Sequence, residues 1–292
     1  MGRLIKPPLF YLLDLWIDVI VLHEWEKGMK TVVITGSTRG IGLGLAKEFL
    51  NAGCQVILSG RNEQNVQTLV SDLSLKYPQA KVAGKTCEVT DRAQVQALWE
   101  YAKSLNPTVD IWINNAGIGH DRNPFNEIPA QCAQDVLHTN LDGLLNGCSI
   151  ALKGMQAQGS GAIYNMLGLG SDGRRIKGLS VYGMSKAAAS YFSRALIAET
   201  RGGNVLVGSL SPGMVLTDLL LNRGQYSISE WATLKKVYNF LAEKVEVVTP
   251  WLVTKILANQ KHGVEIRYLN PLRLGGHAIL AMIGKRNLFR EE

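Results

Sequence analysis

Cysteine is scarce in this sequence, and its few thiols are not spaced for a metal site or a disulfide framework. The 292 residues include four cysteines, and no two of them show a paired or metal-type spacing. The four are Cys54, Cys87, Cys132 and Cys148. This usage indicates a chain from a reducing compartment and predicts no metal site.

Acidic residues are also in the minority, and the positive excess is unevenly distributed. The formal net charge is +7, and residues 261–290 contain six Lys or Arg against one Glu. No helix-turn-helix, RNA-recognition or zinc pattern accompanies this charge, so we expect no nucleic acid partner. An anionic membrane surface or an acidic ligand fits the basic C-terminal tail, residues 276–292, better.

The sequence before the first expected strand lacks a run that would cross a bilayer. Residues 9–22 are apolar except for Asp14 and Asp18, which fall on one face at helical spacing. Fourteen residues with two acids are too short and too polar to span, and no small-residue cleavage site follows. We expect residues 1–29 to form an amphipathic arm. It either lies in a membrane interface, as two tryptophans in it suggest, or packs on the protein or a partner subunit.

The remaining sequence alternates short β-branched runs with amphipathic stretches, as one α/β domain does. Expected strands are 31–35, 56–59, 81–89, 111–114, 162–165 and 204–209, and expected helices are 43–50, 64–75, 93–104, 130–157 and 182–200. This order predicts a Rossmann-type, doubly wound parallel sheet in three layers over residues 30–275.

The alternation breaks over residues 218–258, where we expect a helical lid at the carboxyl edge of the sheet. Two helical pieces, 229–243 and 249–258, make up this segment. The pair Thr249-Pro250 is a typical helix start and is expected to begin the second piece.

A glycine-rich turn follows the first expected strand and opens the next helix. Glycines let the backbone approach a pyrophosphate, whose charge is then met by N–H groups at the helix start. The order of strand, turn and helix favours a dinucleotide site over an unliganded turn. The predicted contacts from this turn are Gly36, Ser37, Thr38, Arg39, Gly40, Ile41 and Gly42.

The end of the second expected strand bears on which dinucleotide binds. It reads Ser59-Gly60-Arg61, without the carboxylate that holds the ribose hydroxyls in NAD sites. Arg61, together with Arg39, can instead contact a 2′-phosphate. We therefore expect NADPH; the alternative is that both arginines are merely solvated.

Tyr182 and Lys186 lie four residues apart in an expected helix, so their side chains share one face. A tyrosine beside a lysine can donate a proton, since nearby positive charge lowers the pKa of the phenol. Alone, the pair is more often a half-buried tyrosine next to a solvated lysine. Here it follows the glycine turn and the run Asn-Asn-Ala-Gly at 114–117, and it precedes Ser-Pro-Gly at 211–213.

These motifs, in this order, resemble those of the short-chain dehydrogenase/reductase family over roughly residues 30–258. The resemblance implies that Tyr182 is the proton donor, that Lys186 with the oxidised nicotinamide lowers its pKa, and that Asn140 holds a water on the proton path. It also implies adenine contacts from Glu88 and Val89. Further cofactor contacts are implied for Asn115, Ala116, Gly117, Pro212, Gly213 and Thr217.

The family's serine that orients the carbonyl has no direct counterpart, because Gly168 stands at its position. Ser171 is the nearest hydroxyl and is the expected substitute; a backbone N–H or a water is the alternative. If neither serves, the chain is a non-catalytic nucleotide-binding scaffold.

The sequence around Gly168 and Ser171, which departs from the pattern of the wider family, resembles the chlorophyll b reductase branch of that family. Residues 110–117, 211–220 and 266–272 also resemble this branch. This resemblance implies reduction of the 7-formyl group of chlorophyll b or chlorophyllide b to a hydroxymethyl group, at a thylakoid membrane. The expected protein is thus membrane-peripheral, in a chloroplast or photosynthetic cell, homo-oligomeric through its long helices, and acts on a large lipophilic substrate. A reductase for another lipophilic carbonyl, such as a sterol, retinoid or keto-lipid, is the alternative.

Overall fold

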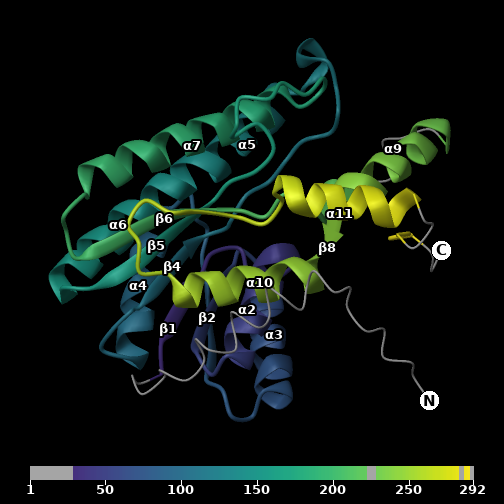
Figure 1. Ribbon diagram of the computed structural model, residues 1–292. Helices are drawn as coiled ribbons and strands as arrows, with labels where there is room; N and C mark the ends of the chain where they lie inside the picture. The colour runs from purple at the N-terminus through teal and green to yellow at the C-terminus, as the bar shows by residue number, and fades with distance from the viewer. Residues whose placement is uncertain (1–28, 222–227, 283–285, 290–292) are drawn as a thin grey trace, which may run out of the picture.

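The computed structural model describes residues 29–221, 228–282 and 286–289 (Figure 1). The predicted N-terminal arm falls almost entirely outside these ranges, as does part of the predicted basic tail. Within them, no helix is both long enough and apolar enough to cross a bilayer.

Seven parallel strands form the central sheet, in the order β3-β2-β1-β4-β5-β6-β9. Their bounds are β1 Thr31–Ile34, β2 Gln55–Gly60, β3 Val82–Thr86, β4 Ile111–Asn114, β5 Gly161–Met166, β6 Val205–Ser211 and β9 Glu265–Arg267. The strand order reverses between β1 and β4, which is where open sheets of this kind bind ligands at their carboxyl edge. The predicted doubly wound fold is confirmed.

Helices cover both faces of this sheet (Figure 1). A hydrophobic core lies on each face of the sheet, and alternate residues of β1 point into each core. Val32 and Ile34 are buried on one face and Val33 on the other. Burial on both faces explains why the β-branched run of β1 is unbroken. The first face carries α2 (Gly40–Asn51), α3 (Glu63–Lys76) and α10 (Val245–Ala258). The second carries α4 (Arg92–Leu105), α6 (Gly143–Gln158) and α7 (Ser180–Glu199).

The single long helix expected over residues 130–157 is interrupted. It consists of α5 (Ala130–Leu137) and α6, joined by one π-helical turn, η2 (His138–Asp142). Such turns widen a helix locally and re-aim the side chains within it. Asn140 lies in this turn and is buried. The short helix η1 (Phe125–Glu127) precedes α5.

A second, two-stranded sheet lies beside the carboxyl edge. β7 (Met214–Leu216) pairs with β8 (Ala242–Lys244), and α8 (Asp218–Leu221) and α9 (Ile228–Leu241) lie between them in the chain. α11 (Pro271–Met282) follows β9 and packs against α9 (Figure 1). Arg286 donates to the carboxylate of Glu243 on β8 at 3.1 Å, and both side chains are buried.

The start of α10 differs from the prediction. The helix begins at Val245, so Pro250 lies inside it rather than at its first position. The missing N–H leaves the carbonyl of Glu246 without its helical partner, and Glu246 is exposed to solvent. α10 packs against α2 in the main core, so of the predicted lid only residues 218–221 and 228–244, among those that the structure describes, remain beside the carboxyl edge.

Candidate active site

The glycine turn between β1 and α2 closes tightly against the loop that follows β4. Gly36 and Gly40 have φ values of +62° and +55°, the left-handed region that favours glycine. A β-carbon added to Gly36 would lie 2.8 Å from the Cα of Ala116. Asn115 Nδ2 donates to the carbonyls of Thr35 and Gly36, both at 2.9 Å. The turn and the Asn-Asn-Ala-Gly run therefore form one cradle.

The N-terminus of α2 is open to an anion. Its N-cap residue, Arg39, makes no side-chain capping bond, and the first turn contains no acidic residue. The first N–H groups of any helix lack partners within the helix and carry positive partial charge. A pyrophosphate is the anion that the sequence predicts at this end of α2.

The ends of β2 and β3 bring the next predicted contacts together. Ser37 and Ser59 exchange backbone and hydroxyl hydrogen bonds, which tie the glycine turn to the end of β2. Arg61 extends from this end with 63% of its side chain exposed, and its Nε lies 3.9 Å from Oε2 of Glu88. Two predicted cofactor residues thus form a weak ion pair with each other.

Residues 212–217, the predicted nicotinamide contacts, lie near the glycine turn. A β-carbon on Gly40 would lie 3.4 Å from Cγ2 of Thr217, so the segment after β7 lies against the turn. Gly213 has a φ of +77°, and a β-carbon there would lie 2.9 Å from Cβ of Leu269. The structure brings this predicted segment and the glycine turn to one edge of the sheet.

Tyr182 and Lys186 lie on α7 with Lys186 Nζ 5.9 Å from the centroid of the Tyr182 ring. Nζ donates to the carbonyl of Met166 at 3.3 Å, and the side chain is buried. Burial lowers the pKa of Lys186 from 10.5 to about 8 and raises the pKa of Tyr182 from 10.0 to about 12. Without cofactor the phenol is thus shifted away from neutrality, so the predicted lowering of its pKa depends on the charge that the oxidised nicotinamide brings.

Asn140 links α7 to the loop after β4. Its Oδ1 accepts from the N–H of Ile118 at 2.8 Å, and its Nδ2 donates to the carbonyl of Ile118 and to Oγ of Ser185, both at 2.9 Å. Both amide protons are therefore used by protein groups, and a water on the proton path would need another atom to hold it. Ser185 Oγ in turn donates to the carbonyl of Tyr182 at 2.7 Å.

Gly168 lies directly against the Tyr182 hydroxyl. A β-carbon on Gly168 would stand 2.6 Å from that oxygen, closer than a carbon can approach. Ser171, the predicted substitute for the family's serine, donates its hydroxyl proton to the Gly168 carbonyl at 2.6 Å. Ser171 thus closes a turn beside Tyr182, with its oxygen fixed in place.

Sequence reasoning did not single out His120 or Ser185, yet both hold the backbone of Tyr182. His120 Nε2 accepts the N–H of Tyr182 at 3.2 Å. His120 lies 62 residues before Tyr182, so no local spacing signals the contact. Ser185 gives a signal, because it stands three residues after Tyr182 on the same helix face.

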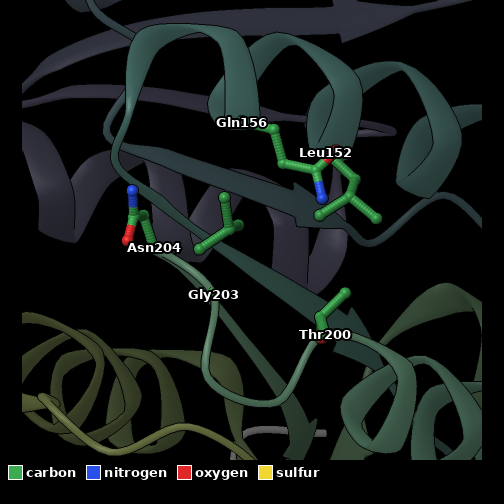
Figure 2. Close-up of a pocket in the computed structure, with 6 residues that line it drawn as sticks. Leu152, Gln156, Thr200, Gly203 and Asn204 are labelled. Atoms are coloured by element: carbon green, nitrogen blue, oxygen red, sulfur yellow. The ribbon is translucent and has the colours of Figure 1, made fainter.

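Two cavities lie away from this site. One of about 340 Å³ is lined by Leu152 and Gln156 of α6 and by residues between α7 and β6, at the amino end of β6 (Figure 2). Another of about 310 Å³ lies between α4, α6 and α7. Neither is lined by Tyr182, Lys186 or the glycine turn, so neither belongs to the candidate active site.

The chain belongs to the short-chain dehydrogenase family, whose model matches residues 30–226. It is therefore an NAD(P)(H)-dependent oxidoreductase that acts on carbonyl or hydroxyl groups. The predicted membership of this family is confirmed.

Two plant proteins are among the most similar relatives. The chloroplastic chlorophyll(ide) b reductase NOL of Oryza sativa subsp. japonica is 39% identical over 254 residues, which cover 83% of this chain and 72% of NOL. The probable chlorophyll(ide) b reductase NYC1 of the same organism is 34% identical, over 93% of this chain and 56% of its own length. This chain thus spans little more than half of NYC1. These matches confirm the resemblance to the chlorophyll b reductase branch.

A solved structure supports the fold. Gluconate 5-dehydrogenase from Burkholderia cenocepacia J2315, determined with NADP and tartrate, aligns with a TM-score of 0.71 at 24% identity. The alignment covers 85% of this chain and 97% of that one.

Proposed function

We propose that this chain uses NADPH to reduce the 7-formyl group of chlorophyll b or chlorophyllide b to a hydroxymethyl group. The observation that carries the proposal is the meeting of Tyr182, Lys186, the glycine turn and Thr217 at one edge of the sheet. The similarity to NOL over most of the chain supports the choice of substrate.

The residues present fit a bound dinucleotide. Its pyrophosphate would lie on the N-terminus of α2, beside the turn that Gly36 and Gly40 form with positive φ values. Glu88 and Val89 would flank the adenine, and residues 115–117 and 212–217 would hold the ribose and carboxamide of the nicotinamide half. When bound, NADPH supplies the hydride that adds to the carbonyl carbon.

The chain's own contribution is a proton and a fixed geometry. As charge develops on the carbonyl oxygen, Tyr182 donates its phenolic proton to that oxygen. Lys186 stabilises the phenolate that results and, through a water in the region of Asn140, returns a proton to it. Lys186 is suited to this because its lowered pKa of about 8 lets it release a proton near neutral pH.

We assign orientation of the carbonyl to Ser171. Its oxygen is already fixed by the bond to Gly168, and rotation of its proton toward the substrate would supply a hydrogen bond to the carbonyl oxygen. Ser171→Ala should lower kcat on the order of a hundredfold, as loss of one oxyanion donor does. Ser71→Ala, which removes a hydroxyl bonded to a backbone carbonyl on exposed α3, is the matched control and should leave kcat unchanged. Equal kcat in wild type and Ser171→Ala would contradict the assignment.

We further propose a membrane-peripheral homo-oligomer in a chloroplast, the compartment named for the plant relatives. The outward face of α11 supports contact with lipid, because Leu272 and Ile279 on it are 87% and 56% exposed. Exposed Leu145 on α6 and Tyr191 on α7 support association through these two helices.

The decisive experiment incubates the protein with NADPH and chlorophyll b and follows the absorption spectrum of the pigment. We expect the formyl pigment to be converted by wild type and by Tyr101→Phe, whose tyrosine lies on α4, but not by Tyr182→Phe. Tyr182→Phe should still bind NADPH, since the glycine turn is untouched. Conversion by Tyr182→Phe would overturn the catalytic assignment. An unchanged pigment spectrum, with NADPH consumed on another lipophilic aldehyde or ketone, would overturn the substrate.

A further inference from the structure

The first turn of α7 is capped by a side chain from a distant loop. Helix N-termini leave N–H groups without intrahelical partners, and the N-cap residue of α7, Leu179, offers no side-chain acceptor. One of these groups is the N–H of Tyr182, which donates to Nε2 of His120 at 3.2 Å. His120 lies in the loop between β4 and η1.

The contacts of His120 fix its tautomer. Its Nδ1 lies 2.7 Å from the carbonyl oxygen of Asp121. A carbonyl can only accept, so Nδ1 carries the proton, and Nε2 must present its lone pair to the N–H of Tyr182. His120 is therefore neutral in this arrangement, and only the neutral form can cap the helix.

This cap closes a ring of hydrogen bonds around Tyr182. The carbonyl of Tyr182 accepts from Ser185, Ser185 accepts from Asn140, and Asn140 bonds both backbone groups of Ile118. Ile118 is joined to His120 through Gly119, which completes the ring. Both backbone polar groups of Tyr182 are thus held by side chains.

The phenol has little room for displacement. Its hydroxyl lies against Gly168, where a β-carbon would stand only 2.6 Å away, and its ring edge lies beside Gly119, at 3.8 Å from the position of a β-carbon there. A small shift of the first turn of α7 would therefore move the hydroxyl relative to Lys186 and to the carbonyl. Misplacement by about 1 Å commonly costs about a hundredfold in rate.

We propose that His120 is a positioning residue for Tyr182, which acts as the acceptor that fixes the first turn of α7 and so the place of the phenolic hydroxyl. The proposal rests on the proposed function for its effect on turnover, but the cap itself is independent of the substrate. Glutamine can present Oε1 roughly where Nε2 lies, whereas leucine fills the space without an acceptor.

The test compares His120→Leu and His120→Gln with wild type in two measurements. The matched control is His262→Leu, because His262 Nδ1 accepts the N–H of Val207 at 3.3 Å and Nε2 lies 2.8 Å from the carbonyl of Ile197, away from Tyr182. In the first measurement, His120→Leu should lower kcat about ten- to a hundredfold with the NADPH dissociation constant unchanged. His120→Gln should recover most of this loss, and His262→Leu should lower thermal stability while keeping kcat.

The second measurement is amide hydrogen exchange of Tyr182 by NMR, which needs no substrate. Exchange should be faster in His120→Leu than in wild type, close to wild type in His120→Gln, and unaffected in His262→Leu. If no carbonyl is reduced by wild type, this result still decides whether the cap exists, so the two proposals fail separately. Wild-type kcat or wild-type exchange in His120→Leu, or a kcat in His120→Gln as low as in His120→Leu, would overturn the role.

Discussion

At Gly168 the oxygen of Tyr182 occupies the space that a side chain would enter. The usual serine of the family therefore does not fit into this site as it stands. We expect Gly168→Ser to lower kcat by on the order of tenfold or more, because the new β-carbon displaces the phenol from its position. Restoring the family's residue should thus damage the enzyme.

Steady-state kinetics with NADPH checks this prediction. Gly275→Ser is the matched control, since an added β-carbon on α11 meets no atom within 4 Å. A rise in kcat for Gly168→Ser would show that the tyrosine adjusts freely and that the glycine is not required by it.

Lys186 lowers the stability of the protein without cofactor. The pKa of Lys186 is about 8 in the folded protein, below its ordinary value of 10.5. The unfolded chain therefore binds the proton of Lys186 more tightly than the folded protein does. As a result, the free energy of unfolding rises as the pH increases from about 8 to 10.5. Below pH 8 the cost of the buried charge is fully present. We expect Lys186→Met to raise the free energy of unfolding at pH 7 by about 3 kcal/mol and to abolish turnover.

Urea unfolding at pH 7 and pH 10 measures this effect. The difference in the free energy of unfolding between Lys186→Met and wild type should be much smaller at pH 10 than at pH 7. Lys153→Met removes an exposed lysine from α6 and should show no such dependence on pH. A gain that is the same at both pH values would contradict the lowered pKa.

The residues that were predictable from the sequence are those whose partners lie near them in the chain or whose motif has a fixed form. Tyr182 and Lys186 share a helix, and residues 36–42 share a turn, so their spacing, together with the order of the motifs along the chain, indicated them. His120 meets Tyr182 only because the loop after β4 folds over α7, and no local pattern encodes that path. The fit between Gly168 and the tyrosine hydroxyl likewise depends on how β5 and α7 pack.

At the scale of elements, the ends of β2 and β3 should set the choice of cofactor. Arg61 is exposed there and Glu88 is its weak partner, so a 2′-phosphate would compete with the carboxylate for the guanidinium. We expect NADPH to bind at least about tenfold tighter than NADH, and Arg61→Ala to lose most of that preference. Glu88→Gln should tighten NADPH, because the competing charge is removed.

Titration of both cofactors by fluorescence into wild type and each variant gives the dissociation constants needed. Arg201→Ala, which removes an exposed arginine after α7, should leave the preference intact. Equal affinity of wild type for the two cofactors would contradict the expectation of NADPH.

The order of strands β1 to β6 and of the helices between them followed from the hydrophobic pattern, whereas β7, β8, β9 and α11 were not predicted, and neither were the interruption before α6 and the start of α10. The π-helical turn η2 interrupts a continuous helical pattern, and Asn140 within it bonds Ile118 and Ser185, which are distant in sequence. Pro250 suggested a helix start, yet burial of Val248 against α2 extends α10 upstream of it.

At the scale of the whole molecule, helix α11 has an apolar face that is exposed at the surface. A surface helix normally has a polar outer face, but the exposed residues of α11 include Pro271, Leu272, Gly275 and Ile279 and no charged side chain. At 12 residues α11 is far shorter than a membrane-spanning helix, so contact with an interface is the consistent arrangement. We expect the protein to co-sediment with anionic vesicles, and Leu272→Glu with Ile279→Glu to weaken this strongly.

Co-sedimentation at low and high salt distinguishes the apolar contribution to vesicle binding from the electrostatic contribution of the basic residues. Leu75→Glu with Leu105→Glu, which alters two exposed leucines on α3 and α4, is the matched control. If the α11 variant binds vesicles as wild type does, α11 is not the contact. If wild type ignores vesicles altogether, the proposed membrane location is wrong.

The pairing of β7 with β8 links the segment over the glycine turn to α9. Val215 on β7 is the register partner of Glu243 on β8, and Glu243 is anchored by Arg286. β7 leads directly into Thr217 over the glycine turn, while β8 continues directly from α9. Because β7 and β8 are paired, we expect a bound cofactor that contacts residues 214–217 to hold α9 in place as well. We therefore expect the dinucleotide to bind before the carbonyl compound and to leave after the alcohol.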